Sequence, residues 1–67
     1  MYDRAKLRDA LKARNMTNET LRKEAGITSS SYYRKLNGED EFEADEIERI
    51  MDVLGLKTPV GIFFRER

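Results

Sequence analysis

The stretch that most constrains the fold of this chain is residues 17–38, TNETLRKEAGITSSSYYRKLNG. It predicts two short helices, over residues 18–24 and about 29–37, separated by a tight turn at residues 25–27. Thr17 and Thr28 are suited to the N-cap, because their hydroxyls can accept from free backbone N–H groups of the next turn. Gly26 can adopt a positive φ and end the first helix sharply. Helices this short are unstable alone, so the rest of the chain must supply a shared core.

Apolar residues four positions apart mark the inward faces of this pair: Leu21 with Ala25, and Tyr32 with Leu36. That spacing places both members of each pair on one side of a helix. Ile27 is predicted to fill the angle between the two helices. Tyr32 is predicted to be a core residue whose hydroxyl needs a hydrogen-bond partner.

Helical patterns also flank the pair. Residues 3–15 carry one narrow apolar stripe, and residues 44–54 carry the strongest helical periodicity of the chain. The second pattern consists of apolar residues at i, i+3, i+4 and i+7, namely Ile47, Ile50, Met51 and Leu54. Phe42 precedes it as a hydrophobic staple, and Gly55 follows it as a C-terminal cap.

Thr58 and Pro59 predict a fifth helix, with Thr as its cap and Pro at its first position. Five short helices without a strand pattern, repeat or linker indicate a single all-α domain over residues 1–67. Ile62, Phe63 and Phe64 either complete its small core or leave an apolar patch for a dimer at Phe63 and Phe64.

Composition excludes several function classes. The 67 residues contain no Cys and no His, which removes disulfides, thiolate metal sites and the commonest general base. The acids at 39–48 lack the Gly and the closing Glu of a calcium loop. We therefore expect no enzyme, metal or cofactor. The charged N-terminus and the lack of a long apolar run predict a soluble intracellular protein.

The zero net charge hides a strong asymmetry between the two halves of the chain. Residues 1–38 hold nine Lys and Arg against four acids, net +5, and residues 39–67 hold four bases against nine acids, net −5. This distribution indicates either a side that faces a polyanion or two ordinary solvated helix surfaces.

The helix pair contains residues at a characteristic spacing: Met16-Thr17-x-x-x-Leu21-x-x-x-Ala25-Gly26-Ile27-Thr28-x-Ser30, followed by Tyr33-Arg34-Lys35-Leu36-Asn37-Gly38. This pattern resembles the Cro/repressor type of helix-turn-helix DNA-binding proteins, also called lambda-repressor-like or XRE-type. Later segments are similar to the fourth and fifth helices of that family: Phe42, Glu46-Ile47, Val53-Leu54-Gly55-Leu56 and Ile62-Phe63-Phe64.

The resemblance implies a compact five-helix domain whose recognition helix, residues 29–37, enters the major groove of an operator, usually as a dimer. The chain would then be a transcriptional regulator of the phage or prophage repressor or Cro type, cytoplasmic in a bacterial cell or a phage-infected host. The implied base-contacting residues are Ser29, Ser30, Tyr33 and Arg34. The phosphate-contacting candidates are Asn18, Arg22, Lys23, Lys35 and Asn37.

The chain departs from the family pattern in three respects. Arg22 stands where a small Ala is usual, and Tyr32 stands where Ile or Val is usual, which predicts a slightly opened or re-angled crossing of the two helices. Residues 39–41, Glu-Asp-Glu, replace bases that often grip phosphate. The acidic loop supports an alternative function, a protein–protein interaction module or antirepressor-like protein that retains the fold without binding DNA.

Overall fold

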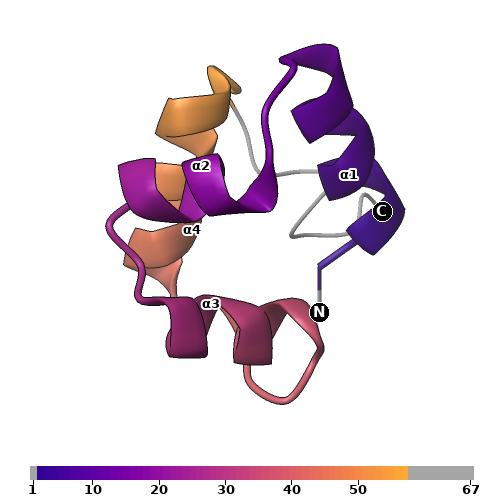
Figure 1. Cartoon of the computed structure of the whole chain (residues 1–67). Coiled ribbons are helices and arrows are strands. Elements are labelled where there is room, and N and C mark those ends of the chain that lie inside the picture. Colours follow the sequence, from indigo (N-terminus) through magenta and orange to yellow (C-terminus); the bar gives the residue numbers. More distant parts are fainter. Residues whose placement is uncertain (1, 58–67) are drawn as a thin grey trace.

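The computed structural model describes residues 2–57 of the chain, which form four α-helices (Figure 1). They are α1 (Arg4–Ala13), α2 (Asn18–Glu24), α3 (Ser29–Leu36) and α4 (Ala44–Leu54). The described residues contain no strand, so the prediction of an all-α fold is confirmed. The fifth predicted helix, which begins at Thr58 and Pro59, lies outside the described residues. Phe63 and Phe64 lie outside them too.

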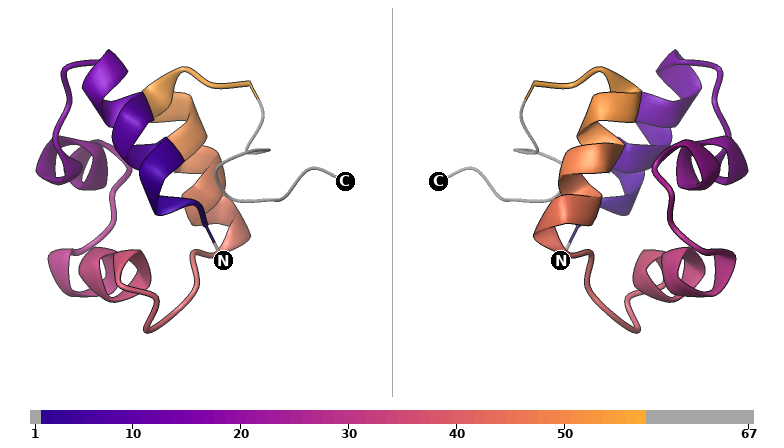
Figure 2. Two further views of the ribbon diagram at one scale, coloured as in Figure 1. Left: turned by 90° about the vertical axis from the view of Figure 1, so that its right-hand side faces the viewer. Right: turned by 90° about the vertical axis from the view of Figure 1, so that its left-hand side faces the viewer.

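The predicted helix pair forms one side of the molecule. Figure 2 shows α2 and α3 along one edge in both views, with α1 and α4 on the other side of them. In Figure 1, α3 lies below α2, and α4 runs behind α2. This arrangement gives the pair one face toward the core and leaves the opposite face of α3 at the surface.

The core draws on all four helices, which explains how such short helices are held. Its largest fully buried side chains are Leu7 from α1, Leu21 from α2, Tyr32 from α3, and Ile50 and Leu54 from α4. Burial of apolar side chains of this size contributes about 1.5–3 kcal/mol each. The sequence-based prediction of these inward faces is confirmed.

Both ends of α2 form as predicted, whereas the cap of α3 does not. The Thr17 hydroxyl accepts from the Thr20 backbone N–H at 3.2 Å, and Gly26 has a φ of 71°. Thr28 occupies the N-cap position of α3, but its side chain makes no capping hydrogen bond. The predicted hydroxyl cap at Thr28 is therefore wrong, and free N–H groups remain at the start of α3.

The first and third helices are shorter than predicted. Asp3 is the N-cap of α1, where its carboxylate accepts from the Lys6 N–H at 3.1 Å. The same helix ends at Ala13, because Asn15 takes a left-handed conformation with a φ of 54°. α3 ends at Leu36, followed by Gly38 with a φ of 84°.

A buried ion pair joins α3 to α4. Lys35 Nζ lies 2.6 Å from Glu46 Oε1, and the two side chains are only 9% and 10% exposed. Glu46 Oε1 also accepts from the Glu43 backbone N–H at 2.8 Å, so it ties the start of α4 to the same pair. Charges this deeply buried are stable only when paired, so each partner depends on the other.

Removing one partner of this pair should cost far more stability than removing both charges. Lys35→Met leaves the Glu46 carboxylate buried without a partner and should lower the free energy of unfolding by about 3–5 kcal/mol. The double variant Lys35→Met/Glu46→Gln keeps an acceptor for the Glu43 N–H and should recover most of that loss. Urea denaturation of the three proteins measures both effects. A double variant no more stable than Lys35→Met would contradict this account.

Candidate nucleic-acid interface

The first turn of α3 presents small polar side chains to solvent. Ser29 and Ser30 are exposed, as is Thr28 just before them, whereas Ser31 is half-buried. Uncapped N–H groups at a helix N-terminus favour negatively charged ligands. Short side chains let another molecule approach this end of the helix closely. The two serines predicted to face bases therefore lie on an accessible surface.

Arg34 lies on α3 one turn beyond the serines, and its guanidinium is at the surface. Its side chain is 57% exposed, and its Nη2 lies 3.4 Å from Asp40 Oδ2. The acidic loop of residues 39–41 thus borders the predicted reading residue directly. An exposed ion pair of this length contributes little stability, about 0.2–1 kcal/mol.

Tyr33 takes part in a polar network that connects α3 to α2. Its hydroxyl donates to Glu19 Oε2 at 2.5 Å, and Glu19 also accepts from Arg22 Nε at 3.2 Å and Nη2 at 2.8 Å. Arg22 Nη1 in turn donates to the Ile27 carbonyl oxygen at 3.1 Å. The network therefore spans both helices and the turn between them. The predicted base contact of Tyr33 would have to come from its ring or from a rearranged hydroxyl.

Glu19 is the residue that this network depends on, and it was not singled out from the sequence. The hydrogen bonds from Arg22 and Tyr33 lower the pKa of Glu19 to about 2. The Glu19 hydrogen bond also raises the pKa of the Tyr33 hydroxyl. Glu19 and Arg22 stand at i, i+3 on α2, a spacing typical of helical ion pairs. That spacing was the sequence signal available, but the bond from Tyr33 depends on the fold.

Tyr32 makes a second connection between the two helices. Its side chain is fully buried, and its hydroxyl donates to Asn18 Oδ1 at 2.7 Å. Burial raises the pKa of this hydroxyl, which stays protonated and available as a donor. The Tyr32 hydroxyl was predicted to need a hydrogen-bond partner, and in the structure that partner is Asn18. Because the side-chain oxygen Oδ1 of Asn18 already accepts from Tyr32, the side-chain NH₂ is the group of Asn18 left to donate to a phosphate.

The remaining phosphate candidates separate into exposed and buried residues. Lys23 and Asn37 are exposed, in the last turn of α2 and at the C-cap of α3. The Arg22 side chain, 14% exposed, is directed to Glu19 and the turn. The predicted phosphate contact of Lys35 must be corrected. The Lys35 ammonium is buried against Glu46, so it cannot reach a phosphate without breaking that ion pair.

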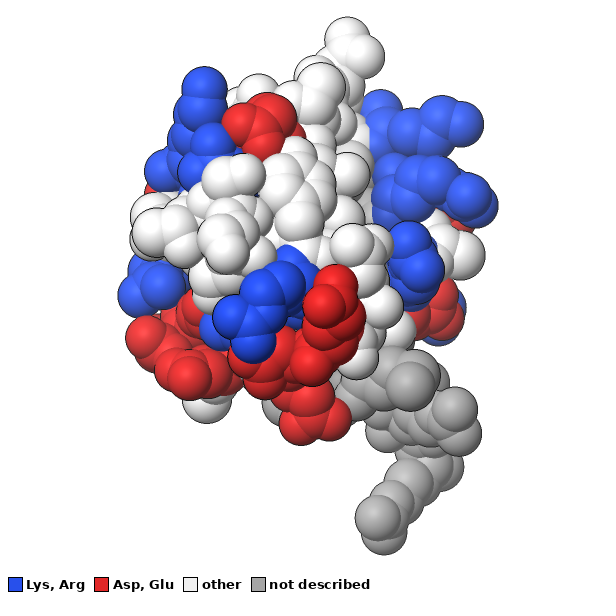
Figure 3. Space-filling model, turned by 60° about the horizontal axis from the view of Figure 1, so that its bottom comes forward, with Lys and Arg blue, Asp and Glu red and all other residues white. Residues whose placement is uncertain are grey.

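The charges around α3 are mixed. Figure 3 shows a broad uncharged area with Lys and Arg gathered at two of its sides and Asp and Glu crowded along its lower edge. Glu39, Asp40 and Glu41 are all exposed in the loop that follows α3. On the face that Figure 3 shows, the Lys and Arg side chains therefore do not form one continuous basic area. The three acids belong to the segment that leads from α3 to α4.

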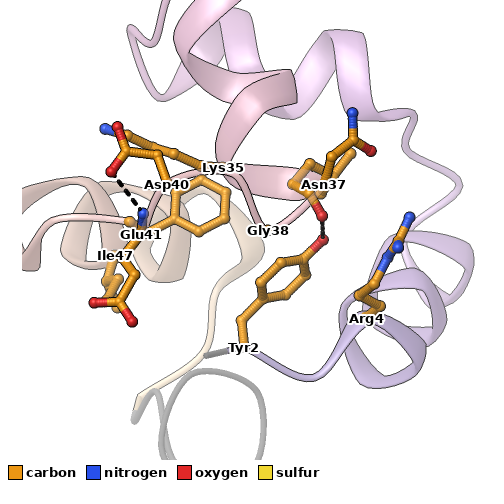
Figure 4. Close-up of a pocket in the computed structure, with 10 residues that line it drawn as sticks. Tyr2, Arg4, Lys35, Asn37, Gly38, Asp40, Glu41 and Ile47 are labelled. Atoms are coloured by element: carbon orange, nitrogen blue, oxygen red, sulfur yellow. Dashed lines mark hydrogen bonds between the residues drawn. The ribbon is translucent and has the colours of Figure 1, made fainter.

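A pocket of about 370 Å³ lies beyond the C-terminal end of α3, away from the serines (Figure 4). Its apolar lining comes from Tyr2, Leu36, Phe42 and Ile47, and the Tyr2 hydroxyl donates to the Leu36 carbonyl oxygen. Asp40 also lines it, with its carboxylate hydrogen-bonded to the Glu41 backbone N–H. The lining includes neither Ser29 and Ser30 nor Arg34, so the pocket is separate from the predicted base-reading residues.

The fold and this surface together define a helix-turn-helix protein. A family model for the Cro/C1-type HTH DNA-binding domain matches residues 6–59. That range covers α2, the turn and α3 completely, along with α4 and most of α1. The chain therefore belongs to the Cro/C1-type helix-turn-helix family, and the resemblance seen in its sequence is confirmed.

No curated protein and no solved structure matched the chain in the comparisons. Within the described part of the chain, no helix is long and apolar enough to cross a membrane. The same residues contain no cluster of three or more acidic side chains arranged to hold a metal ion.

The hydrogen bonds of Glu19 should make the stability of the folded protein depend on pH in the acidic range. The pKa of Glu19 is lowered from 4.5 to about 2 in the folded protein, so its contribution is fully present above pH 4.5. It is lost as the pH falls through about 2, where the folded protein binds the proton. Glu19→Gln should therefore melt below the wild type at pH 6, and the difference should shrink toward pH 2. Melting curves across this range test it, and a difference that grows on acidification would contradict it.

Proposed function

We propose that this protein is a sequence-specific regulator of transcription, of the phage or prophage repressor or Cro type. It binds a double-stranded operator by inserting α3 into the major groove. The observation that carries the proposal is the exposed first turn of α3, with Ser29 and Ser30 in front of the exposed Arg34. Membership of the Cro/C1-type DNA-binding family supports it.

The side chains on α3 divide by the chemistry they bring to a base pair. Arg34 carries a planar fork that can bond the O6 and N7 of guanine, a contact worth about 1–3 kcal/mol of discrimination. Ser29 and Ser30 can bond either bases or phosphates. The Tyr33 ring can contact a thymine methyl group beside them.

Phosphate contacts set the register of the complex. Asn18 at the start of α2 offers its amide NH₂, while Lys23 and Asn37 are exposed at the ends of α2 and α3. These contacts add affinity for any duplex and make binding salt-dependent, but they do not read sequence. Because acids border α3 on one side, we expect a smaller salt dependence than for a helix surrounded by Lys and Arg.

We further propose that two copies bind a two-fold symmetric operator in the cytoplasm. One α3 covers only a few base pairs, and a second copy doubles the sequence that is read. Phe63 and Phe64 are the proposed dimer patch. Regulation then comes from occupying the operator and requires no enzymatic step.

Base readout and phosphate contact can be separated by two substitutions on this face. Arg34→Ala should relax the preference at one base pair per half-site by about 1–3 kcal/mol. Lys23→Ala should weaken binding to all duplexes alike and reduce the salt slope by about one unit. Selection from a randomised duplex pool, followed by titration at several salt concentrations, measures both.

The wild-type protein provides the control for this experiment. If it enriches no motif and shows no dependence on salt, the DNA-binding proposal fails. The alternative, a protein–protein interaction module or antirepressor-like protein, would then be preferred. It predicts protein partners that are retained by Arg34→Ala and lost by Phe64→Ala.

A further inference from the structure

We propose that Asp40 is a positioning residue that sets the specificity of Arg34. The inference rests on the proposed function and goes beyond it, because it assigns a role in base reading to the acidic loop. Asp40 does not touch DNA in this account. Its carboxylate holds the Arg34 guanidinium in the orientation from which it reads guanine.

The loop holds Asp40 at a defined place relative to α3. Gly38 adopts a φ of 84°, which turns the chain back over the end of the helix. The Gly38 N–H donates to the Lys35 carbonyl oxygen at 3.2 Å, and the Glu39 N–H donates to the Arg34 carbonyl oxygen at 2.9 Å. Paired bonds of this kind close a helix C-terminus and fix the residues that follow.

Each of the two oxygens of the Asp40 carboxylate accepts one hydrogen bond, and together these bonds orient the group. Oδ1 accepts from the Glu41 backbone N–H at 2.9 Å, which leaves Oδ2 facing Arg34 Nη2 at 3.4 Å. The carboxylate thus acts as a fixed acceptor on a closed loop, while Arg34 is the flexible partner. Arginine has many rotamers, and fixing them beforehand reduces the entropy lost when it binds a base.

The contact leaves the donors that guanine needs. Only Nη2 of Arg34 is engaged within the described residues, and by a single oxygen. The guanidinium has five N–H donors, so it retains a two-donor edge for the O6 and N7 of guanine. A carboxylate that used two donors of the fork would compete with guanine, whereas this one supports the side chain from one end.

The acidic loop therefore has two opposite effects on binding. Its charges repel the phosphate backbone and lower the affinity for every duplex. Asp40 alone, through its contact with Arg34, raises the preference for guanine at one base pair. Glu39 is exposed and makes no side-chain hydrogen bond or ion pair within the described residues, so it has only the first effect.

Asp40→Asn and Glu39→Gln separate these effects, because each removes one negative charge from the same loop. Both should raise affinity for random duplexes to a similar extent. Asp40→Asn should also reduce the guanine preference at the Arg34 base pair by roughly two- to fivefold, the range expected for one exposed ion pair. Glu39→Gln should leave that preference unchanged. In an Arg34→Ala background, the two substitutions should become equivalent.

The base pair is identified first, as the one where Arg34→Ala relaxes the motif selected by the wild type. If Asp40→Asn retains the guanine preference, or sharpens it, Asp40 is not a positioning residue. This inference is then overturned, while the proposed DNA-binding function stands. If the wild-type protein selects no motif at all, the proposed function and this inference are both overturned.

Discussion

The proposed DNA-binding surface depends on one constraint, the angle between α2 and α3. A turn of a few residues cannot set that angle, and neither helix is stable alone. Two tyrosines on α3 fix it instead: buried Tyr32 donates to Asn18, and Tyr33 donates to Glu19. Both acceptors lie in the first turn of α2. The end of α2 that we propose contacts phosphate is thus held in place by hydrogen bonds from α3, the helix that we propose contacts bases.

The other side of α3 is fixed to the rest of the core by a different interaction. The buried pair of Lys35 and Glu46 joins its last turn to the first turn of α4. Buried ion pairs seldom add net stability compared with apolar residues, but they are specific in geometry. With Lys35 directed to Glu46 on one side of α3, Ser29, Ser30 and Arg34 are left exposed.

The acidic loop modifies this surface and does not abolish it. Asp40 contacts Arg34, and the three acids belong to the segment that leads from α3 to α4. An operator-binding protein needs a high ratio of specific to non-specific affinity. Under the proposed function, weak attraction to phosphate combined with an Arg34 held by Asp40 would raise that ratio, at the expense of total affinity.

The sequence predicted most of the fold because caps and periodicity are local signals. Thr17, Gly26 and Gly55 bounded helices correctly, and Tyr32 was recognised as a core residue in need of a partner. Predictions failed where tertiary contacts decide. Lys35 is indistinguishable from a solvated helix residue until α4 brings Glu46 to it. The roles of Glu19 and Asp40 likewise depend on which side chains the turns bring together.

The most direct test of the central claim, that the first turns of α3 and α2 form the DNA-binding surface, is a titration followed by nuclear magnetic resonance. Isotope-labelled protein would be mixed with its selected duplex, and the shift of each backbone amide recorded. The account predicts the largest changes at Ser29, Ser30 and Arg34 and at Asn18, with small changes along α4. Changes concentrated on α4, or none at all, would contradict it.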